Sequence, residues 1–110
     1  MDINYDNKRI QKVCSSIASM QKELGHVRAK VLNMRLSQLQ KVANLESLRH
    51  DPGNWHELKQ NRAGQIAVSI GGQYRLILKP TGDTPPLKPD GGLDWSQITN
   101  VTIIEIVDYH

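Results

Sequence analysis

The stretch Gln65-Ile-Ala-Val-Ser-Ile-Gly-Gly-Gln-Tyr-Arg-Leu-Ile-Leu-Lys79 has the pattern of a β-hairpin. Apolar and β-branched residues on both sides favour two strands, and the glycine pair between them is typical of a tight turn. A two-residue turn at Gly71-Gly72 would set Val68 opposite Arg75 and place this cation on an apolar side of the hairpin. Either the turn is longer, or both sheet faces are partly apolar and Arg75 lies in a concave site.

A third strand is predicted near the end of the chain. The segment Val101-Thr-Ile-Ile-Glu-Ile-Val107 is the most apolar in the sequence and is rich in β-branched residues, which indicates a buried strand. Three groups able to move or hold protons follow it, namely Asp108, Tyr109 and His110. Simple alternation would put Asp108 and His110 on one face and Tyr109 on the other. Chain ends are also often loosely ordered polar segments, so the ending alone does not decide the function.

The first half of the chain has a helical period. Apolar residues recur every three or four positions from Ile10 to Leu24, and Gly25 is a plausible helix end. A second stripe predicts a helix from about His26 to Leu48. Two helices joined by a short glycine turn favour an antiparallel pair. Residues 1–6 alternate weakly and could form a short edge strand.

These patterns predict one domain over residues 1–110, since the length suits a single core. Helices come first and strands second, which indicates an α+β fold with two N-terminal helices on one face of a small, mainly antiparallel sheet. Another strand is possible at residues 55–59. Residues 80–97 are rich in proline, glycine and aspartate and predict a long loop, which is uncommon unless it is mobile or functional.

Composition restricts the function classes. The net charge of +3 favours anionic partners only mildly, although basic residues predominate between residues 11 and 49. A single cysteine, Cys14, excludes an intrachain disulfide and is expected to be a small buried thiol. The four histidines are scattered, so no metal site is expected, and no phosphate loop or dinucleotide motif is present. No apolar run reaches membrane-spanning length and no secretory signal is evident, which favours the cytoplasm.

The candidate chemistry lies in the second half. The segment Trp55-His-Glu-Leu-Lys-Gln-Asn-Arg62 brings the imidazole of His56 close to Lys59 and Arg62. Together with Arg75 and the terminal Asp108-Tyr109-His110, these groups suit phosphodiester cleavage without a metal. Imidazole can act as acid or base near neutral pH, and the cations can stabilise charge on phosphorus. Each of them is also compatible with an ordinary surface or strand role.

In these segments the chain resembles the HigB, or plasmid-maintenance "killer protein", branch of the RelE/ParE toxin superfamily. The resemblance rests on His56-x-Leu58-Lys59, on Tyr74-Arg75-Leu76 at a strand, and on the terminal Asp108-Tyr109-His110, in this order. The 80–97 loop is longer than in compact family members.

The resemblance implies a RelE-like fold of about four strands with two helices, and a ribosome-dependent mRNA endoribonuclease that needs no cofactor. It implies a type II toxin that inhibits translation, with a HigA-like helix-turn-helix antitoxin as its partner and operator DNA bound only through that antitoxin. The matching catalytic positions are His56, Arg75, Asp108, Tyr109 and His110, and the matching RNA-binding positions are Lys59 and Arg62. The sequence does not show which of the two histidines is the base and which is the acid.

Two other functions stay open at this point. One is a non-catalytic binding module of the same fold, such as a ParE-like target binder or a lapsed regulator, although the two histidines argue against it. The other is a nonspecific nucleic-acid binder that uses the basic side of the second helix.

Overall fold

A computed structural model describes residues 1–109 of the 110-residue chain. The strands are β1 (Asp2–Tyr5), β2 (His56–Glu57), β3 (Ile66–Ser69), β4 (Tyr74–Pro80) and β5 (Asn100–Asp108), and the α-helices are α1 (Lys8–Val13) and α2 (Ile17–Lys41). Three short 3₁₀ helices are η1 (Leu45–Leu48), η2 (Gln60–Arg62) and η3 (Trp95–Gln97). Among these residues no helix is both long and apolar enough to span a membrane.

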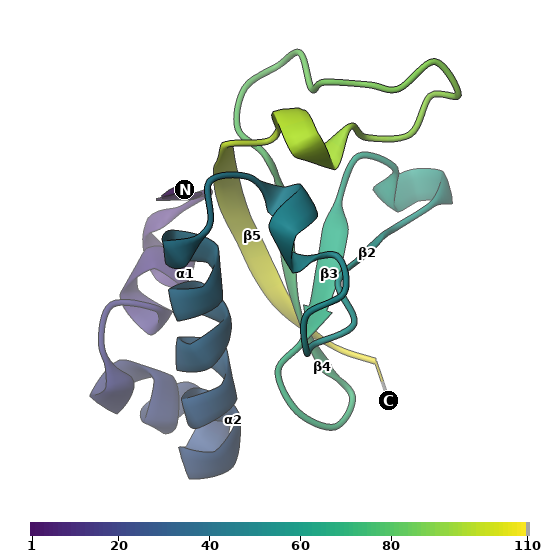
Figure 1. Cartoon of the computed structure of the whole chain (residues 1–110). Helices are drawn as coiled ribbons and strands as arrows, with labels where there is room; N and C mark the ends of the chain where they lie inside the picture. Colours follow the sequence, from purple (N-terminus) through teal and green to yellow (C-terminus); the bar gives the residue numbers. More distant parts are fainter. Residues whose placement is uncertain (110) are drawn as a thin grey trace.

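The five strands form one mixed sheet in the order β1-β5-β4-β3-β2. The edge strand β1 runs parallel to β5, and every other neighbouring pair is antiparallel. Figure 1 shows α1 and α2 on one side of the sheet, with the segment before β5 across one end and the end of β5 at the other. The predicted α+β architecture is therefore confirmed, with one strand more than the resemblance implied.

The helix-covered face supplies the hydrophobic core. Its sheet residues are fully buried at alternate positions, because successive side chains of a strand point to opposite faces. They pack against a stripe of α2 and against η1. The residues concerned are Ile66, Val68, Ile70, Leu76, Leu78, Val101 and Ile103 on the sheet, and Met20, Leu24, Ala29, Leu32, Leu36, Leu39, Leu45 and Leu48 on the helices.

The predicted first helix was wrong in its continuity. It ends at Val13, and a new helix starts at Ile17, where the Ser16 hydroxyl accepts a hydrogen bond from the Ser19 amide at 3.1 Å. The apolar spacing continues across this break because Ile10 and Cys14 face the same core as α2. Periodicity alone therefore could not reveal the interruption.

The helix end predicted at Gly25 agrees with the structure. Gly25 has φ +81° and ψ 172° and interrupts the helical backbone at the position predicted for a helix end. A left-handed φ of this kind favours glycine. The second predicted helix is too long, since α2 ends at Lys41 and only the short η1 follows. Cys14 is buried as predicted, and this burial raises the pKa of its thiol to about 11.

The β3–β4 hairpin has a turn one residue longer than a two-residue glycine turn. Ser69 pairs with Arg75 and Val68 with Leu76. The Ile70 amide donates to the Tyr74 carbonyl at 3.1 Å, and the Tyr74 amide donates to the Gly71 carbonyl at 3.1 Å, which closes the turn. This offset answers the conflict raised by the sequence. Arg75 lies on the face opposite the core, where its charge does not meet the apolar row of β3.

A β-bulge in β5 makes a second one-residue shift. Leu78 pairs with Ile103 whereas its neighbour Ile77 pairs with Glu105, so Ile104 is the extra residue. Without the bulge Glu105 would continue on the face of Ile103 and enter the core. With the bulge it lies on the opposite face.

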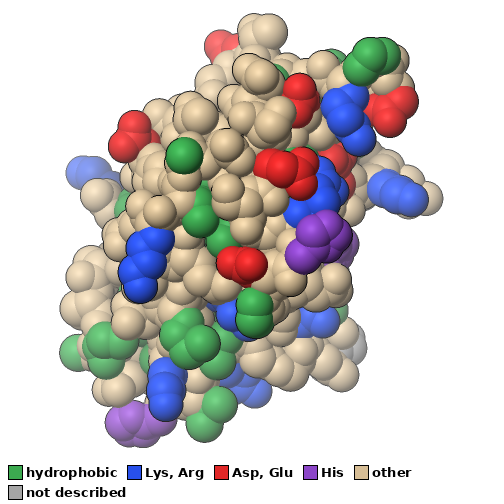
Figure 2. Space-filling model, in the orientation of Figure 1, with side chains coloured by type: hydrophobic (Ala, Val, Ile, Leu, Met, Phe, Trp, Pro, Cys, Tyr) green, Lys and Arg blue, Asp and Glu red, His purple; other side chains and the backbone are tan. Residues whose placement is uncertain are grey.

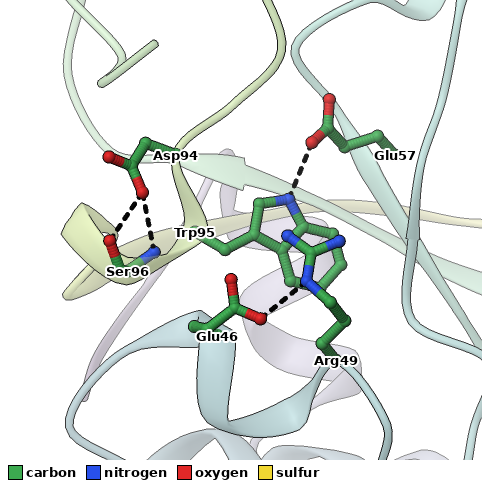
Figure 3. A network of polar contacts seen from close by, with 6 residues as sticks. All are labelled: Glu46, Arg49, Glu57, Asp94, Trp95 and Ser96. Atoms are coloured by element: carbon green, nitrogen blue, oxygen red, sulfur yellow. Dashed lines mark hydrogen bonds and ion pairs between the residues drawn. The ribbon is translucent and has the colours of Figure 1, made fainter. Parts of the chain in front are cut away.

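The segment between β4 and β5 is held in place by Trp95. This side chain is 1% exposed, and its indole Nε1 donates to Glu57 Oε1 of β2 at 2.9 Å. The Arg49 guanidinium stacks on the indole at 4.0 Å and also pairs with Glu46 at 2.6 Å. Figure 3 shows this network joining η1, β2 and η3. The predicted loop thus has an anchor in the core that its proline-rich and glycine-rich composition did not indicate.

Candidate functional site

The candidate site lies on the open face, by which we mean the side of the sheet opposite the helices. Cross-strand pairing assigns it positions from all four strands β2 to β5. Two of its residues, Ala67 and Ile77, are fully buried and form an apolar floor. Polar or half-exposed residues surround this floor. The open-face positions are His56, Ala67, Ser69, Arg75, Ile77, Lys79, Thr102, Glu105 and Val107.

His56 is half-buried in β2, opposite Ala67. Its Nδ1 lies 2.7 Å from the carbonyl oxygen of Asn54. A carbonyl can only accept, so this contact requires a proton on Nδ1 and leaves Nε2 of the neutral ring with a lone pair. Asn54 has φ +56°, a conformation that asparagine tolerates better than most residues. The local backbone therefore favours the ring tautomer that a general base needs.

Arg75 lies in β4 beside the hairpin turn. One terminal nitrogen, Nη1, donates to the carbonyl of Gly72 at 2.8 Å and to that of Tyr74 at 3.0 Å. These bonds hold the guanidinium against its own turn. A guanidinium has five N–H donors in a planar fork, so Arg75 has further donors that suit a phosphate.

Of the two predicted RNA-binding residues, Arg62 points across the open face. It donates to Gln65 Oε1 at 2.8 Å and to Glu105 Oε2 at 3.1 Å, which connects η2 to the last strand. Lys59 is exposed and precedes η2. The two cations therefore differ, since Arg62 is held by neighbours and Lys59 extends into solvent.

The terminal residues divide between the faces. Asp108 pairs with Tyr74, so by strand alternation it belongs to the helix-covered face. The next residue, Tyr109, therefore belongs to the open face. The Tyr109 amide donates to the Gln73 carbonyl at 2.9 Å, and its side chain is 48% exposed. The predicted separation of Asp108 from Tyr109 agrees with this register. The prediction for His110 lies outside the described residues.

The fold thus brings His56, Arg62, Arg75 and Tyr109 to one face, whereas Asp108 has the opposite alternation. Across the sheet, His56 is in register with Ala67, Ile77 and Glu105. Arg75 lies two residues from Ile77 along β4. Two strand spacings separate β2 from β4, about 10 Å. A single RNA nucleotide and its two phosphates could extend across such a span. The arrangement can provide a base, a phosphate-binding fork and an exposed aromatic ring.

Two features of this site were missed by the sequence reasoning. Glu105 lies beside Arg62, and Asn54 orients the imidazole. A signal for Glu105 was present, because it is the one charged residue in the apolar run from Val101 to Val107. Nothing in the sequence pattern pointed to the Asn54 carbonyl, because that contact depends on the backbone conformation of a turn.

The charge distribution of the visible surface is uneven. Figure 2 shows acidic side chains mostly over the half of the molecule that contains the segment before β5, hydrophobic side chains mainly toward the opposite end, and Lys and Arg side chains over both. Within residues 1–109, no group of three His, Cys, Asp or Glu side chains is arranged as a metal site requires.

The fold matches those of known toxin structures. A YoeB/ParE toxin from Agrobacterium tumefaciens superposes with a TM-score of 0.60 at 10% identity, covering 100% of both chains. A YoeB dimer from Staphylococcus aureus superposes with a TM-score of 0.57 at 15% identity, covering 100% of this chain and 97% of that one. No protein-family model matches the sequence, and no curated protein does. The likeness shows a RelE/YoeB-like fold.

Proposed function

We propose that this protein is the toxin of a type II toxin–antitoxin system and cleaves mRNA on the ribosome, without a metal ion. The observation that carries the proposal is the position of His56 on the open face, with its Nδ1 hydrogen-bonded to Asn54 and Arg75 on the same face. The fold shared with YoeB/ParE toxin structures supports it, as do the segments that resemble the HigB branch.

In the proposed reaction, the ribose 2′ oxygen of the RNA attacks phosphorus while the bond from phosphorus to the 5′ oxygen breaks. A base takes the 2′-hydroxyl proton, and an acid supplies a proton to the leaving 5′ oxygen. His56 Nε2 suits the role of base, because Nδ1 already carries the other proton. Products are a 2′,3′-cyclic phosphate and a 5′-hydroxyl, so atoms and charge balance without water or a cofactor.

The remaining residues have supporting roles in this proposal. The Arg75 fork stabilises the negative charge that builds on the phosphate oxygens. Tyr109 stacks on or orients a base, and Lys59 and Arg62 contact neighbouring phosphates. His110 is proposed as the second acid–base group, and Asp108 as a group that holds an imidazole or the RNA.

The proposal also names partners. A toxin of this kind requires a cognate antitoxin, for which we propose a HigA-like helix-turn-helix protein that carries the contact with operator DNA. The ribosome and its mRNA are the proposed targets in the cytoplasm.

The test is primer extension on mRNA bound to purified ribosomes, with wild-type protein beside His56→Gln and His110→Ala. Loss of a general base typically lowers the rate by about 10²–10⁴-fold, so the wild-type cuts should nearly vanish in His56→Gln. His50→Gln is the matched control, since His50 is exposed and lies outside the open face. Circular dichroism and thermal melting would show that each variant is folded.

Two results would count against this function. Cuts of wild-type strength from a His56→Gln, His110→Ala double variant would exclude both imidazoles from the chemistry. An intact message with folded, antitoxin-free wild-type protein would favour the binding-module alternative, and the segment before β5 would then be the next surface to examine.

A further inference from the structure

Arg35 is an unusual residue for the interior of this protein. It lies on α2, it is 8% exposed, and among residues 1–109 it is the one charged residue that is buried. None of the four ion pairs found in this part of the chain includes it. Burial of a cation without a carboxylate is costly, and it lowers the pKa of Arg35. A methionine or leucine would fill such a position at lower cost, so the guanidinium needs a specific explanation.

The hydrogen bonds of Arg35 provide one. Its Nε donates to the Ser69 carbonyl, at the end of β3, at 2.8 Å. Its Nη1 donates at 3.1 Å to Gln38 Oε1, and the Gln38 amide in turn donates to the Pro52 carbonyl at 3.4 Å. Arg35 therefore connects α2 directly to the end of β3 and, through Gln38 of the same helix, to the segment that precedes β2.

These two attachment points are also joined to each other. The Ser69 amide donates to the Gly53 carbonyl at 2.8 Å, so residue 69 binds Arg35 through its carbonyl and the 52–54 segment through its amide. The next residue of that segment, Asn54, provides the carbonyl for His56 Nδ1. The Trp55 indole fixes the same turn by donating to Pro52 at 3.1 Å.

The same point of attachment bears on Arg75. Ser69 is its cross-strand partner, and the Ser69 hydroxyl accepts from the Gly71 amide at 3.3 Å in the turn that Arg75 binds. Both sides of the candidate site, the imidazole of β2 and the guanidinium of β4, therefore depend on the end of β3.

Close packing leaves this arrangement little freedom. A Cβ at Gly53 would lie 2.9 Å from Arg35 Nε and 2.7 Å from Val68 Cγ2, and Gly53 has φ +123°. Only glycine permits the guanidinium to approach the backbone this closely at such a φ.

We propose that Arg35 is a positioning residue, which fixes the 52–54 turn against the end of β3 and so holds His56 in its Nδ1-protonated tautomer on the open face. Its effect on cleavage rests on the proposed function above. Its effect on the tautomer does not, and this difference allows the two ideas to be tested separately.

The experiment is ¹⁵N NMR of protein labelled at histidine, at about pH 8, above the ordinary imidazole pKa of about 6.5. Wild-type protein should show His56 as the Nδ1–H tautomer, with the signal assigned by its loss in His56→Gln. Arg35→Met should shift His56 toward the Nε2–H tautomer while the protein remains folded. Arg35→Lys should be intermediate, because it keeps the charge without the planar fork. Lys30→Met, which removes an exposed cation from the same helix, should resemble wild type.

The cleavage assay gives the second readout. A small misplacement of a catalytic group can lower the rate by up to about 10²-fold, so Arg35→Met should reduce kcat by about tenfold or more with little change in KM. Loss of stability alone would lower the folded fraction and would leave the tautomer of the folded protein unchanged.

A fold-preserving variant covers the case in which Arg35→Met does not fold. Gln38→Leu removes the acceptor of Arg35 Nη1 and the link to Pro52 but keeps the bond from Arg35 Nε to Ser69, so it should shift the tautomer in the same direction by a smaller amount. The proposal is overturned if wild-type His56 is not the Nδ1–H tautomer, or if folded Arg35→Met, or Gln38→Leu in its place, keeps the wild-type tautomer ratio. If wild-type protein cuts no message, the proposed function fails while the NMR result still decides the role of Arg35.

Discussion

The two faces of the sheet use the same strands in opposite ways. On the helix-covered face every second residue of β3 and β4 is an apolar side chain that packs against α2. On the open face Ala67 and Ile77 form a small buried floor, and the residues around them are His56, Arg62, Arg75 and Glu105. Chemically useful groups thus occupy the face whose side chains contribute least to the core. The contrast predicts that stability and activity depend on different, adjacent residues.

The largest expected effect separates two neighbours in β4. Leu76→Ala removes a fully buried side chain from the core and should lower the free energy of unfolding by about 2–5 kcal/mol. Arg75→Ala removes two hydrogen bonds of a half-exposed side chain and should lower the free energy of unfolding by about 1 kcal/mol or less. Urea unfolding of both variants measures the difference. Equal losses would show that the faces do not divide stability and function in this way.

The bulge offers a sharper test of which face a residue occupies. Deletion of Ile104 removes the extra residue, so Glu105 should stay opposite Ile77 and Val107 opposite Arg75. We expect the free energy of unfolding to fall by about 0.5–3 kcal/mol, the range usual for changes of one residue. Nuclear Overhauser contacts between Arg75 and Val107 would report the register.

Deletion of Ile106 is the control for this experiment. It leaves the bulge in place and should move Val107 opposite Leu76, which exchanges the faces of the last residues. If deletion of Ile104 produced this same exchange, Ile104 would not be the residue that sets the register.

The smallest expected effect concerns the pair formed by Arg62 and Glu105 on the open face. Their side chains are 31% and 46% exposed, so solvent screens the interaction. A double-mutant cycle with Arg62→Met and Glu105→Gln should give a coupling free energy of about 0.2–1 kcal/mol that falls as salt is added. A coupling several times larger, or one that salt does not change, would mean that this pair helps to hold the sheet together.

Much of the fold was predictable from local patterns. The β3–β4 hairpin, the strand after Val101, the edge strand near Ile3 and the interruption at Gly25 all appear where the sequence placed them. The helix break after Val13 was missed because the apolar spacing continues through it. Trp95 was missed because its anchoring role depends on Glu57 and Arg49, which are distant in sequence.

The candidate site was predictable as a set of residue types but not as an arrangement. The sequence brought forward His56, Arg75 and Tyr109, and their placement on one face required the register of four strands. The contacts of Arg35 could not be predicted, because in the sequence it looks like any other basic residue of a surface helix. Only the packed structure shows that its guanidinium is buried against Ser69.

By itself the sequence determined the type and order of most helices and strands, though not all their bounds, because periodicity and turn chemistry act between near neighbours. It did not determine which face each strand residue occupies beyond the first irregularity. One extra residue in the hairpin turn moved Arg75 out of the apolar row, and one extra residue at Ile104 moved Glu105 and Tyr109 to the open face. A shift of one residue exchanges the two faces of a strand, and its position is set by pairing between distant segments. Only the tertiary structure could therefore decide which groups share a site.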